Sequence, residues 1–361
     1  MLKTVDECFF YIQNGANIKQ GDIDGGFPIT RIETIANDKF NRDRMGFAGI
    51  INPIKYEQYI LEDGDLLMSH INSVQYLGRT VLYEKMEDEV IIHGMNLLRL
   101  RANRNIINPA YAKYYFYGYK FKKQLNNIIK KSVNQASFSV KDLKKIIIDI
   151  PTISEQDKLV KILDKAHKII RIRQNELLEM NNLIKARFVE MFGTPYGNEK
   201  CFPMMTVDDV IEFTGGAQPD KKYFEYEPTE DNIRLIQIRD YKTDNYITYI
   251  PKSMAKRFCD SDDIMIGRYG PPIFQILKGI EGSYNVALMK AMPKIGNKEF
   301  IRYFLKQECL FNYLDGLSQR TAGQSGIDMP ALKAYPLPYP PIELQNEFAI
   351  FVKQVDKSKL I

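Results

Sequence analysis

The sequence predicts an α+β protein in which two similar mixed α/β domains are separated by long helices that form an antiparallel coiled coil, with the second helix shortened. Three observations predict this fold class: the two halves of the chain repeat each other, a long central segment lacks proline and glycine, and short β-branched runs lie between turn residues in each half. The expected boundaries are 1–150 for the first domain, 151–193 for the helical spacer, 194–340 for the second domain and 341–361 for the shortened helix.

The composition indicates a folded chain of more than one domain. Its 361 residues exceed the size of a typical domain, and 45% of them are hydrophobic, which is enough to bury a core in each half. With 50 basic and 45 acidic side chains the net charge is +5, which excludes a histone-like polycation. The four cysteines lie far apart and no apolar run is long enough to cross a bilayer, so we expect a reduced cytoplasmic protein without membrane contact.

The two halves share an internal repeat. SVNQASFSVKDLKKIIIDIPTISEQDKL, which begins at residue 132, aligns at an offset of 189 residues with TAGQSGIDMPALKAYPLPYPPIELQNEF, which begins at residue 321. We expect this offset to hold without a gap from Asn96 and Asn285 to Lys168 and Lys357. Earlier positions pair at shifting offsets, so the halves share a frame and differ in their loops.

Runs typical of strands precede the repeat's helices. They are short, β-branched and bounded by turn residues, and they comprise Phe27 to Ile32, Leu66 to Ser69, Val90 to His93, Ile233 to Ile238 and Ile264 to Ile266.

An aromatic helix follows the strands in each half. It covers NPAYAKYYFYGYKFKKQLNN in the first half, starting at Asn108 and Pro109, and NKEFIRYFLKQECLFNYLDG in the second. Such rings could stack on bases. Bulky residues keep the same helical spacing in both copies, however, which favours core packing.

A single long helix is expected between the halves. No proline or glycine occurs from Ser154 to Phe192, and Gly193 and Pro195 follow. Apolar residues at three- and four-residue steps form a coiled-coil seam, which comprises Leu159, Leu163, Ala166, Ile170, Leu177, Met180 and Ile184. So long a stripe must be buried against another helix, and the segment after Pro341 begins a second copy that could pack antiparallel on it.

Complete active-site motifs are absent from the sequence. The three histidines are isolated from the cysteines, so we expect no metal centre. No Gly-Lys dipeptide occurs, which excludes a P-loop ATPase. Asn108-Pro109-Ala110-Tyr111 resembles the loop of DNA amino-methyltransferases but lacks its second proline.

Motifs that are mostly duplicated extend over the whole chain. They are Ile150-Pro151-Thr152-Ile153-Ser154-Glu155-Gln156, its counterpart Tyr339-Pro340-Pro341-Ile342-Glu343-Leu344-Gln345, the helix end Arg187-Phe188-Val189-Glu190-Met191-Phe192-Gly193, and the loops around Gln135 and Gln324. In this arrangement the sequence resembles the specificity (S) subunit of Type I restriction-modification systems.

The resemblance implies two target recognition domains that each read half of a bipartite site in double-stranded DNA. It implies helices that set the half-site spacing and dock methylation (M) subunits and a restriction (R) subunit. The chain itself would have no active site and no cofactor, with S-adenosylmethionine, ATP and Mg²⁺ on the partner subunits, in a prokaryotic cytoplasm. The second helix departs from the family pattern in length, and self-association through the shortened coil is one way to complete it.

Basic and amide residues in corresponding loops are the expected DNA contacts, because lysine and arginine neutralise phosphates while arginine, asparagine and glutamine read base edges. The loop from Lys130 to Gln135, opposite Gln319 to Gln324, ranks first; the alternative is an ordinary turn capped by the glutamine. The predicted contacts are Arg42, Arg44, Arg79, Lys130, Lys131, Asn134, Gln135, Lys221, Lys222, Arg268, Tyr269, Arg320, Gln324 and Ser325.

Three other functions fit parts of the sequence. A self-contained restriction or methylation enzyme is disfavoured by the missing motifs. A specificity subunit of a Type IIB-like or fused restriction-methylation system would contain the same reading domains. A coiled-coil adaptor without DNA affinity would have the same long helices without DNA-reading domains.

Overall fold

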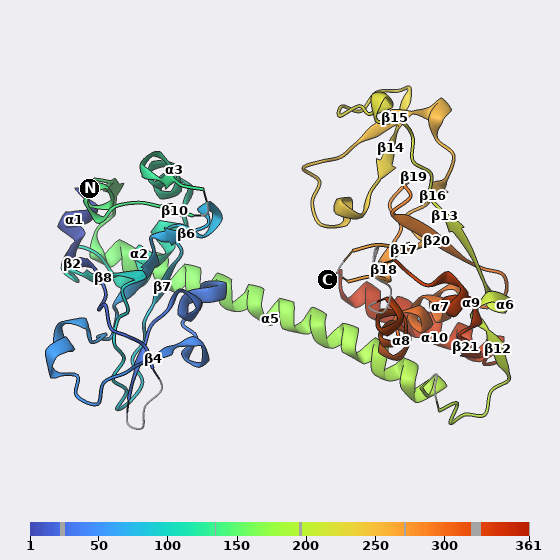
Figure 1. Ribbon diagram of the computed structural model, residues 1–361, viewed down its shortest axis with the longest axis horizontal. Coiled ribbons are helices and arrows are strands. Elements are labelled where there is room, and N and C mark those ends of the chain that lie inside the picture. Colours follow the sequence, from blue (N-terminus) through green and yellow to red (C-terminus); the bar gives the residue numbers. More distant parts are fainter. Residues whose placement is uncertain (22–25, 134, 195–196, 271, 319–325, 361) are drawn as a thin grey trace. The chain divides into compact units, whose positions relative to one another are not determined.

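The computed structural model describes residues 1–21, 26–133, 135–194, 197–270, 272–318 and 326–360. Two units divide the chain, Met1–Arg171 and Ile172–Ile361, and helix α5 (Ile153–Phe192) runs from the first into the second (Figure 1). Both units contain strands and helices, so the predicted fold class is confirmed.

The first unit has eleven described strands and four helices besides α5. The strands are β1 (Leu2–Thr4), β2 (Phe9–Asn14), β3 (Phe27–Ile29), β4 (Gly46–Ala48), β5 (Leu66–Ser69), β6 (Ile71–Asn72), β7 (Thr80–Leu82), β8 (Leu97–Ala102), β9 (Lys130–Lys131), β10 (Ala136–Ser137) and β11 (Ile147–Asp149). The helices are α1 (Val5–Cys8), α2 (Pro109–Tyr117), α3 (Tyr119–Ile128) and α4 (Val140–Lys144).

The second unit repeats this order of elements with a different insertion. Its strands are β12 (Met204–Thr206), β13 (Ile211–Gly215), β14 (Asn232–Ile236), β15 (Tyr249–Pro251), β16 (Phe258–Cys259), β17 (Ile264–Gly267), β18 (Gln275–Lys278), β19 (Gly282–Tyr284), β20 (Leu288–Pro293) and β21 (Pro336–Pro338). Its helices are α6 (Val207–Val210), α7 (Lys298–Leu305), α8 (Glu308–Ser318), α9 (Met329–Ala334) and α10 (Ile342–Ser358).

A four-stranded antiparallel sheet forms the frame that the units share. Its strand order is β2-β8-β5-β7 in the first unit and β13-β20-β17-β18 in the second. A short helix with a capping box leads into each sheet, and the cap is Thr4 with Glu7 in α1 and Thr206 with Asp209 in α6. The insertions differ: the first unit adds the pair β3-β4, and the second adds the sheet β15-β14-β19-β16.

The repeat offset changes between the sheet and the helices. Leu66 and Ile264 are equivalent, because each is the first residue of the third strand of the shared sheet. Leu66 pairs with Leu100 and Ile264 pairs with Ala291, so the equivalent residues of β8 and β20 are 191 apart rather than 189. The expectation of a gapless alignment from Asn96 was therefore wrong. The offset of 189 begins at the helices, because Asn108 and Asn297 are both N-caps. The connection before the helix is two residues shorter in the second unit.

The aromatic helix is two helices in each unit. Gly118 takes an extended conformation and separates α2 from α3, because its N–H bonds to the carbonyl of Tyr115 and leaves the helical path. A similar break follows Leu305 at the end of α7. Core packing of the aromatic residues is confirmed by Phe121 and Phe300, which are buried in their units.

The run Val90 to His93 does not form a strand. Ile92 makes only isolated bridges, to Ile29 and to Ile60, because it lies where two different segments approach it. The other predicted runs overlap β3, β5, β14 and β17.

A buried glutamine explains the duplicated proline-to-glutamine motif. The Oε1 atom of Gln156 accepts the N–H of Asn108 at 2.8 Å, and Gln345 accepts the N–H of Asn297 at 2.8 Å. Both amides donate to the carbonyl of the motif's proline, and neither side chain is exposed. Each glutamine thus ties the start of the aromatic helix to the start of the spacer helix.

Helix α10 pairs antiparallel with the second half of α5. Near the end of α5, Arg187 forms an ion pair with Glu347 at 3.0 Å, while Arg173 donates to the carbonyl of Lys359 at 2.9 Å. The predicted antiparallel pair with a shortened second helix is therefore confirmed within the second unit.

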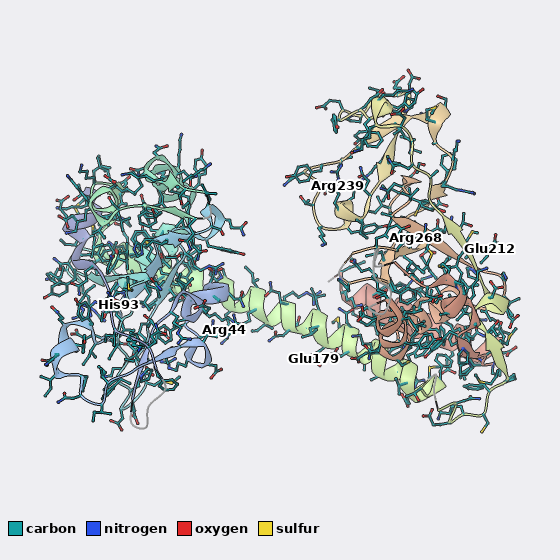
Figure 2. The ribbon with its side chains drawn as sticks, in the orientation of Figure 1. Arg44, His93, Glu179, Glu212, Arg239 and Arg268 are labelled. Carbon is teal, nitrogen blue, oxygen red and sulfur yellow. The ribbon has the colours of Figure 1, made fainter. Side chains whose placement is uncertain are left out.

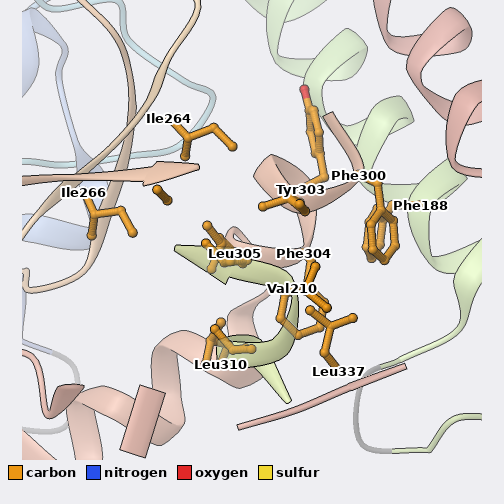
Figure 3. Close-up of a cluster of buried hydrophobic side chains, with 14 of the residues drawn as sticks. Phe188, Val210, Ile264, Ile266, Phe300, Tyr303, Phe304, Leu305, Leu310 and Leu337 are labelled. Atoms are coloured by element: carbon orange, nitrogen blue, oxygen red, sulfur yellow. The ribbon is translucent and has the colours of Figure 1, made fainter. Parts of the chain in front are cut away.

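Aromatic rings fill the core beneath this pair. Phe188 of α5 meets Phe348 of α10 edge to face, with ring centroids 5.4 Å apart, and stacks on Phe300 of α7 at 5.8 Å. Figure 3 shows Phe188 beside Phe300 in this cluster. None of the helices in the described part of the chain combines the length and the apolar character that a membrane crossing requires.

Candidate nucleic-acid interface

An exposed basic hairpin projects from the first unit. Lys130 and Lys131 form β9 and pair with β10, and both side chains are exposed without an ion-pair partner among the described residues. The turn closes through the N–H and hydroxyl of Ser132, which donate to the carbonyl of Gln135 at 2.8 Å. The predicted first-choice loop is thus a cationic hairpin whose lysines can neutralise phosphate.

The loop between β5 and β7 lies beside this hairpin. Strand β6 of the loop pairs with β10, so loop and hairpin belong to one three-stranded sheet. Arg79 ends the loop, with its Nε 3.1 Å from the carboxylate of Asp38 and its guanidinium 4.6 Å from the ring centroid of Tyr76. The structure therefore joins the loop that ends at Arg79 to the hairpin that carries Lys130 and Lys131.

Lys122 adds a second cation next to Arg79. Its amine donates to the carbonyl of Leu77 at 3.2 Å. Burial lowers the pKa of Lys122; Asp38 raises this pKa and Arg79 lowers it. Lys122 was not among the DNA contacts predicted from the sequence. The other copy of the repeat has an apolar residue at this position, and this difference could have indicated a role for Lys122 in the first unit.

The second unit builds the equivalent surface from Arg268 and Tyr269. Tyr269 forms a bridge with Gly326. The loop after β17 is thereby joined to the segment before α9, as β6 is joined to β10. The guanidinium of Arg268 lies 5.2 Å from the ring centroid of Tyr269, and Figure 2 labels Arg268. Of the other predicted contacts, Asn134, Arg320, Gln324 and Ser325 lie outside the described residues.

Arg42 forms a partly buried ion pair within the first unit. Its guanidinium donates to both carboxylate oxygens of Glu89, at 2.8 and 2.6 Å. The pairing holds the pKa of the Glu89 carboxyl at about 2 and raises the pKa of Arg42. Two parallel bonds of this kind stabilise the fold and leave Arg42 few donors for a ligand.

The remaining predicted cations lie in short 3₁₀ turns. Arg44 is exposed in the same turn as Arg42 (Figure 2). Lys221 and Lys222 are exposed in a turn of the second unit, where the Lys222 amine is 3.5 Å from Asp220. The contacts within each unit do not join these three residues to the loops described above.

The insertion of the second unit also holds an aromatic hollow that the sequence did not predict. Its volume is about 450 Å³ and it is lined by Tyr226, Arg239 and Tyr246 among others. The Arg239 guanidinium lies 5.6 Å from the Tyr246 ring centroid and donates to the hydroxyl of Thr248 at 3.1 Å. The lining residues all lie between Tyr226 and Tyr249, and the folding of this insertion brings them together.

The predicted seam of α5 is covered along only part of its length. In the C-terminal half, Leu177 and Met180 are partly buried and Ile184 is fully buried. In the first half Leu159 is 40% exposed and Ile170 is 52% exposed. In contrast, Phe348 of α10, which is equivalent to Leu159 in the repeat, is fully buried.

No group of three or more His, Cys, Asp or Glu side chains in the described ranges is placed to hold a metal ion. The buried thiols of Cys8 and Cys259 have pKa values raised to about 11 by burial, so they stay protonated at neutral pH. The surfaces described above consist of cations, amides and aromatic rings, which are groups suited to binding nucleic acid.

Comparison with known proteins is consistent with these surfaces. The family model "Type I restriction modification DNA specificity domain" matches residues 6–182 and 200–361. A type I restriction enzyme MjaX specificity subunit of Methanocaldococcus jannaschii is 28% identical over 372 residues, covering 96% of this chain and 84% of the relative. The EcoKI specificity subunit of Escherichia coli is 24% identical over 186 residues, covering 50% of this chain and 40% of the relative.

A solved structure has the same fold. The S subunit of a Type I restriction-modification system from M. genitalium matches with a TM-score of 0.54 and 13% identity, covering 99% of this chain and 90% of that chain. At this low identity the match concerns the arrangement of the backbone.

Proposed function

Because this chain belongs to the family of Type I restriction modification DNA specificity domains, we propose that it is the DNA-reading subunit of such a system, with each unit reading one half of a bipartite duplex site. The observation that carries the proposal is the repeated surface: a loop after the third strand of the sheet is joined to a second, basic or polar segment in both units. Two copies of one surface are what two half-sites require.

The catalytic steps belong to other chains in this proposal. S-adenosylmethionine, ATP and Mg²⁺ are expected on the methylation and restriction subunits in the cytoplasm of a prokaryote. Incubating the purified chain with duplex DNA and all three additives tests this division of labour. Methylation or cleavage by the chain alone would show that it is a self-contained enzyme.

Removing the charge of the basic hairpin is expected to weaken binding to all DNA sequences by a similar factor. With Lys130 and Lys131 both changed to alanine, the slope of log affinity against log salt should fall by about 1.8, because each lost phosphate contact removes about 0.9. The measurement is a fluorescence titration with duplex DNA at several salt concentrations.

Changing Lys55 and Lys85, two exposed lysines outside the hairpin, to alanine is the matched control. An equal fall in the salt slope in both double variants would contradict a specific role of the hairpin. If the wild-type chain fails to bind duplex DNA, both alone and with its partner subunits, the proposed function is wrong. The result would then favour a coiled-coil adaptor without DNA affinity.

The uncovered half of the α5 seam is proposed to bind a helix of a partner subunit. It continues the face that α10 covers further along, with exposed apolar side chains at Leu159, Ile162 and Ile170. Exposed cations, among them Lys161, Lys165, Lys168 and Arg171, flank this stretch. Two copies of so basic a surface would repel each other, so the partner helix is expected to carry acidic residues beside its apolar face.

Placing a charge in this stripe is expected to weaken assembly without unfolding the chain. Ile170→Glu should reduce affinity for the methylation subunit about tenfold or more, since a buried charge in a helix interface has no partner. Leu178→Glu is the control, because Leu178 is 57% exposed but lies off the seam. Mass photometry of the mixed subunits gives the affinity, and a thermal melt of each variant alone checks its fold.

Equal weakening by both variants would contradict the assignment of the stripe. Self-association of the wild-type chain that Ile170→Glu abolishes would identify a second copy as the occupant.

A further inference from the structure

We propose that Arg79 in the first unit and Gln275 in the second unit are equivalent base-contacting residues that help to set the sequence preference of the two half-sites. The inference rests on the proposed function and adds the residues through which the two units differ in what they read.

The strand registers make the two positions equivalent. In the first unit Met68 pairs with Thr80, and the N–H of Ser69 then bonds to the carbonyl of Arg79 at 2.9 Å. In the second unit Ile266 is equivalent to Met68 and pairs with Ile276. The next residue, Gly267, pairs with Gln275. Both residues therefore close the loop that leaves the third strand of the shared sheet.

The preceding residue has the same unusual backbone in both units. Gly78 has a φ of +69°, and Phe274 has a φ of +55°. A left-handed φ is easy for glycine and strained for phenylalanine. The second unit retains this conformation with a bulky, buried side chain, so the fold holds Arg79 and Gln275 in matching geometry by different means.

Arg79 is oriented by its neighbours and keeps donors free. Its Nε faces Asp38 at 3.1 Å and its guanidinium plane lies near the ring of Tyr76. Among the described residues none accepts a hydrogen bond from its two terminal nitrogens. Arginine uses two such donors to contact the O6 and N7 atoms of guanine.

Gln275 offers a different pattern at the same place. Its Nε2 donates to the carbonyl of Pro272 at 2.9 Å, which leaves one amide hydrogen and the Oε1 atom. Glutamine contacts the N6 and N7 atoms of adenine with this pair. One backbone geometry with two readable side chains is what two different half-sites need.

Cations lie next to both positions to hold the DNA backbone. Lys130 and Lys131 are on the sheet that includes the Arg79 loop, and Arg268 is at the start of the Gln275 loop. Contacts to phosphate fix the register of a protein on the duplex, so a neighbouring side chain can read one base pair.

The test is a selection from a duplex library randomised in both half-sites, using the full chain assembled with its methylation subunits. Arg79→Gln should reduce the preference for one base at one position of one half-site about tenfold or more and leave the other half-site unchanged. Gln275→Arg should alter one position of the other half-site only. Arg104→Gln is the matched control, because Arg104 is paired with Asp63 at the opposite end of β5.

Arg79→Lys separates base reading from the ion pair with Asp38. Lysine keeps the charge but loses the planar pair of donors. The variant should lose the same base preference while its overall affinity changes less than about threefold.

Unchanged preferences in Arg79→Lys and Gln275→Arg would overturn the inference. Equal broadening of both half-sites would do so too, because it would indicate a general loss of structure. An unaltered complex that selects no sequence at all would instead contradict the proposed function, so the two failures are distinguishable. If Arg79→Gln does not fold, as judged by circular dichroism, the other two variants decide.

Discussion

Replacing Phe348 by alanine is expected to lower the free energy of unfolding of the second unit by about 3–5 kcal/mol. The side chain is fully buried, and its ring centroid lies 5.4 Å from that of Phe188 and 5.4 Å from that of Tyr303. Its loss would leave a cavity between α5, α7 and α10. The measurement is urea unfolding monitored by hydrogen exchange, which shows in which unit the free energy of unfolding has changed.

Leu159→Ala is the matched control, because Leu159 has the position of Phe348 in the repeat. It is 40% exposed, so its change is expected to cost less than about 1 kcal/mol. Equal effects of the two substitutions would show that the first half of the seam is already covered in the isolated chain.

Acidification is expected to destabilise the first unit selectively. Burial lowers the pKa of His93 to about 3 and that of His70 to about 4, from an ordinary value of 6.5. Each histidine is buried in its neutral form, so its contribution is complete above pH 6.5 and is lost as the pH falls toward the folded pKa. The loss approaches about 1.4 kcal/mol per pH unit for each histidine well below pH 6.5, and it amounts to about 3 kcal/mol for both between pH 6.5 and 5.

The geometry around His93 supports this expectation. Its Nε2 lies 2.8 Å from the carbonyl of Leu97, and its Nδ1 has no hydrogen-bond partner among the described residues. The third histidine, His167, lies on the part of α5 within the first unit, so no histidine belongs to the second unit.

The measurement is urea unfolding of the chain at several pH values between 7 and 5. The double variant His70→Leu with His93→Leu should be less stable at pH 7 but should lose most of the pH dependence of the first unit. A pH slope that is the same in the variant and the wild type would contradict the role of these histidines. The second unit serves as an internal control.

Much of the fold could be predicted because its signals are local or repeated. A run without helix breakers predicts α5, and the spacing of Phe300 and its neighbours predicts a buried face. The break at Gly118 was not predicted, since glycine is tolerated in helices and only its extended conformation ends α2. Val90 to His93 resembled a strand because local propensity does not show whether a partner strand is available.

The candidate site was only partly predictable. The basic hairpin followed from comparison of the two repeats, and the loop carrying Arg268 followed from its composition. The equivalence of Arg79 and Gln275 could not be predicted, because the loops before them differ in sequence and only the strand register aligns them. The hollow at Arg239 depends on contacts within an insertion that the first unit lacks.

Two related units joined by a long helix could be predicted without coordinates, because duplication and helical periodicity are properties of the residue order. Which cations remain available to a ligand depends on the folded arrangement of the chain. Arg42 and Glu89 are 47 residues apart, and nothing near either residue indicates their ion pair. A guanidinium that donates to both oxygens of a carboxylate keeps few donors for DNA, and whether such a pair forms depends on packing between distant segments.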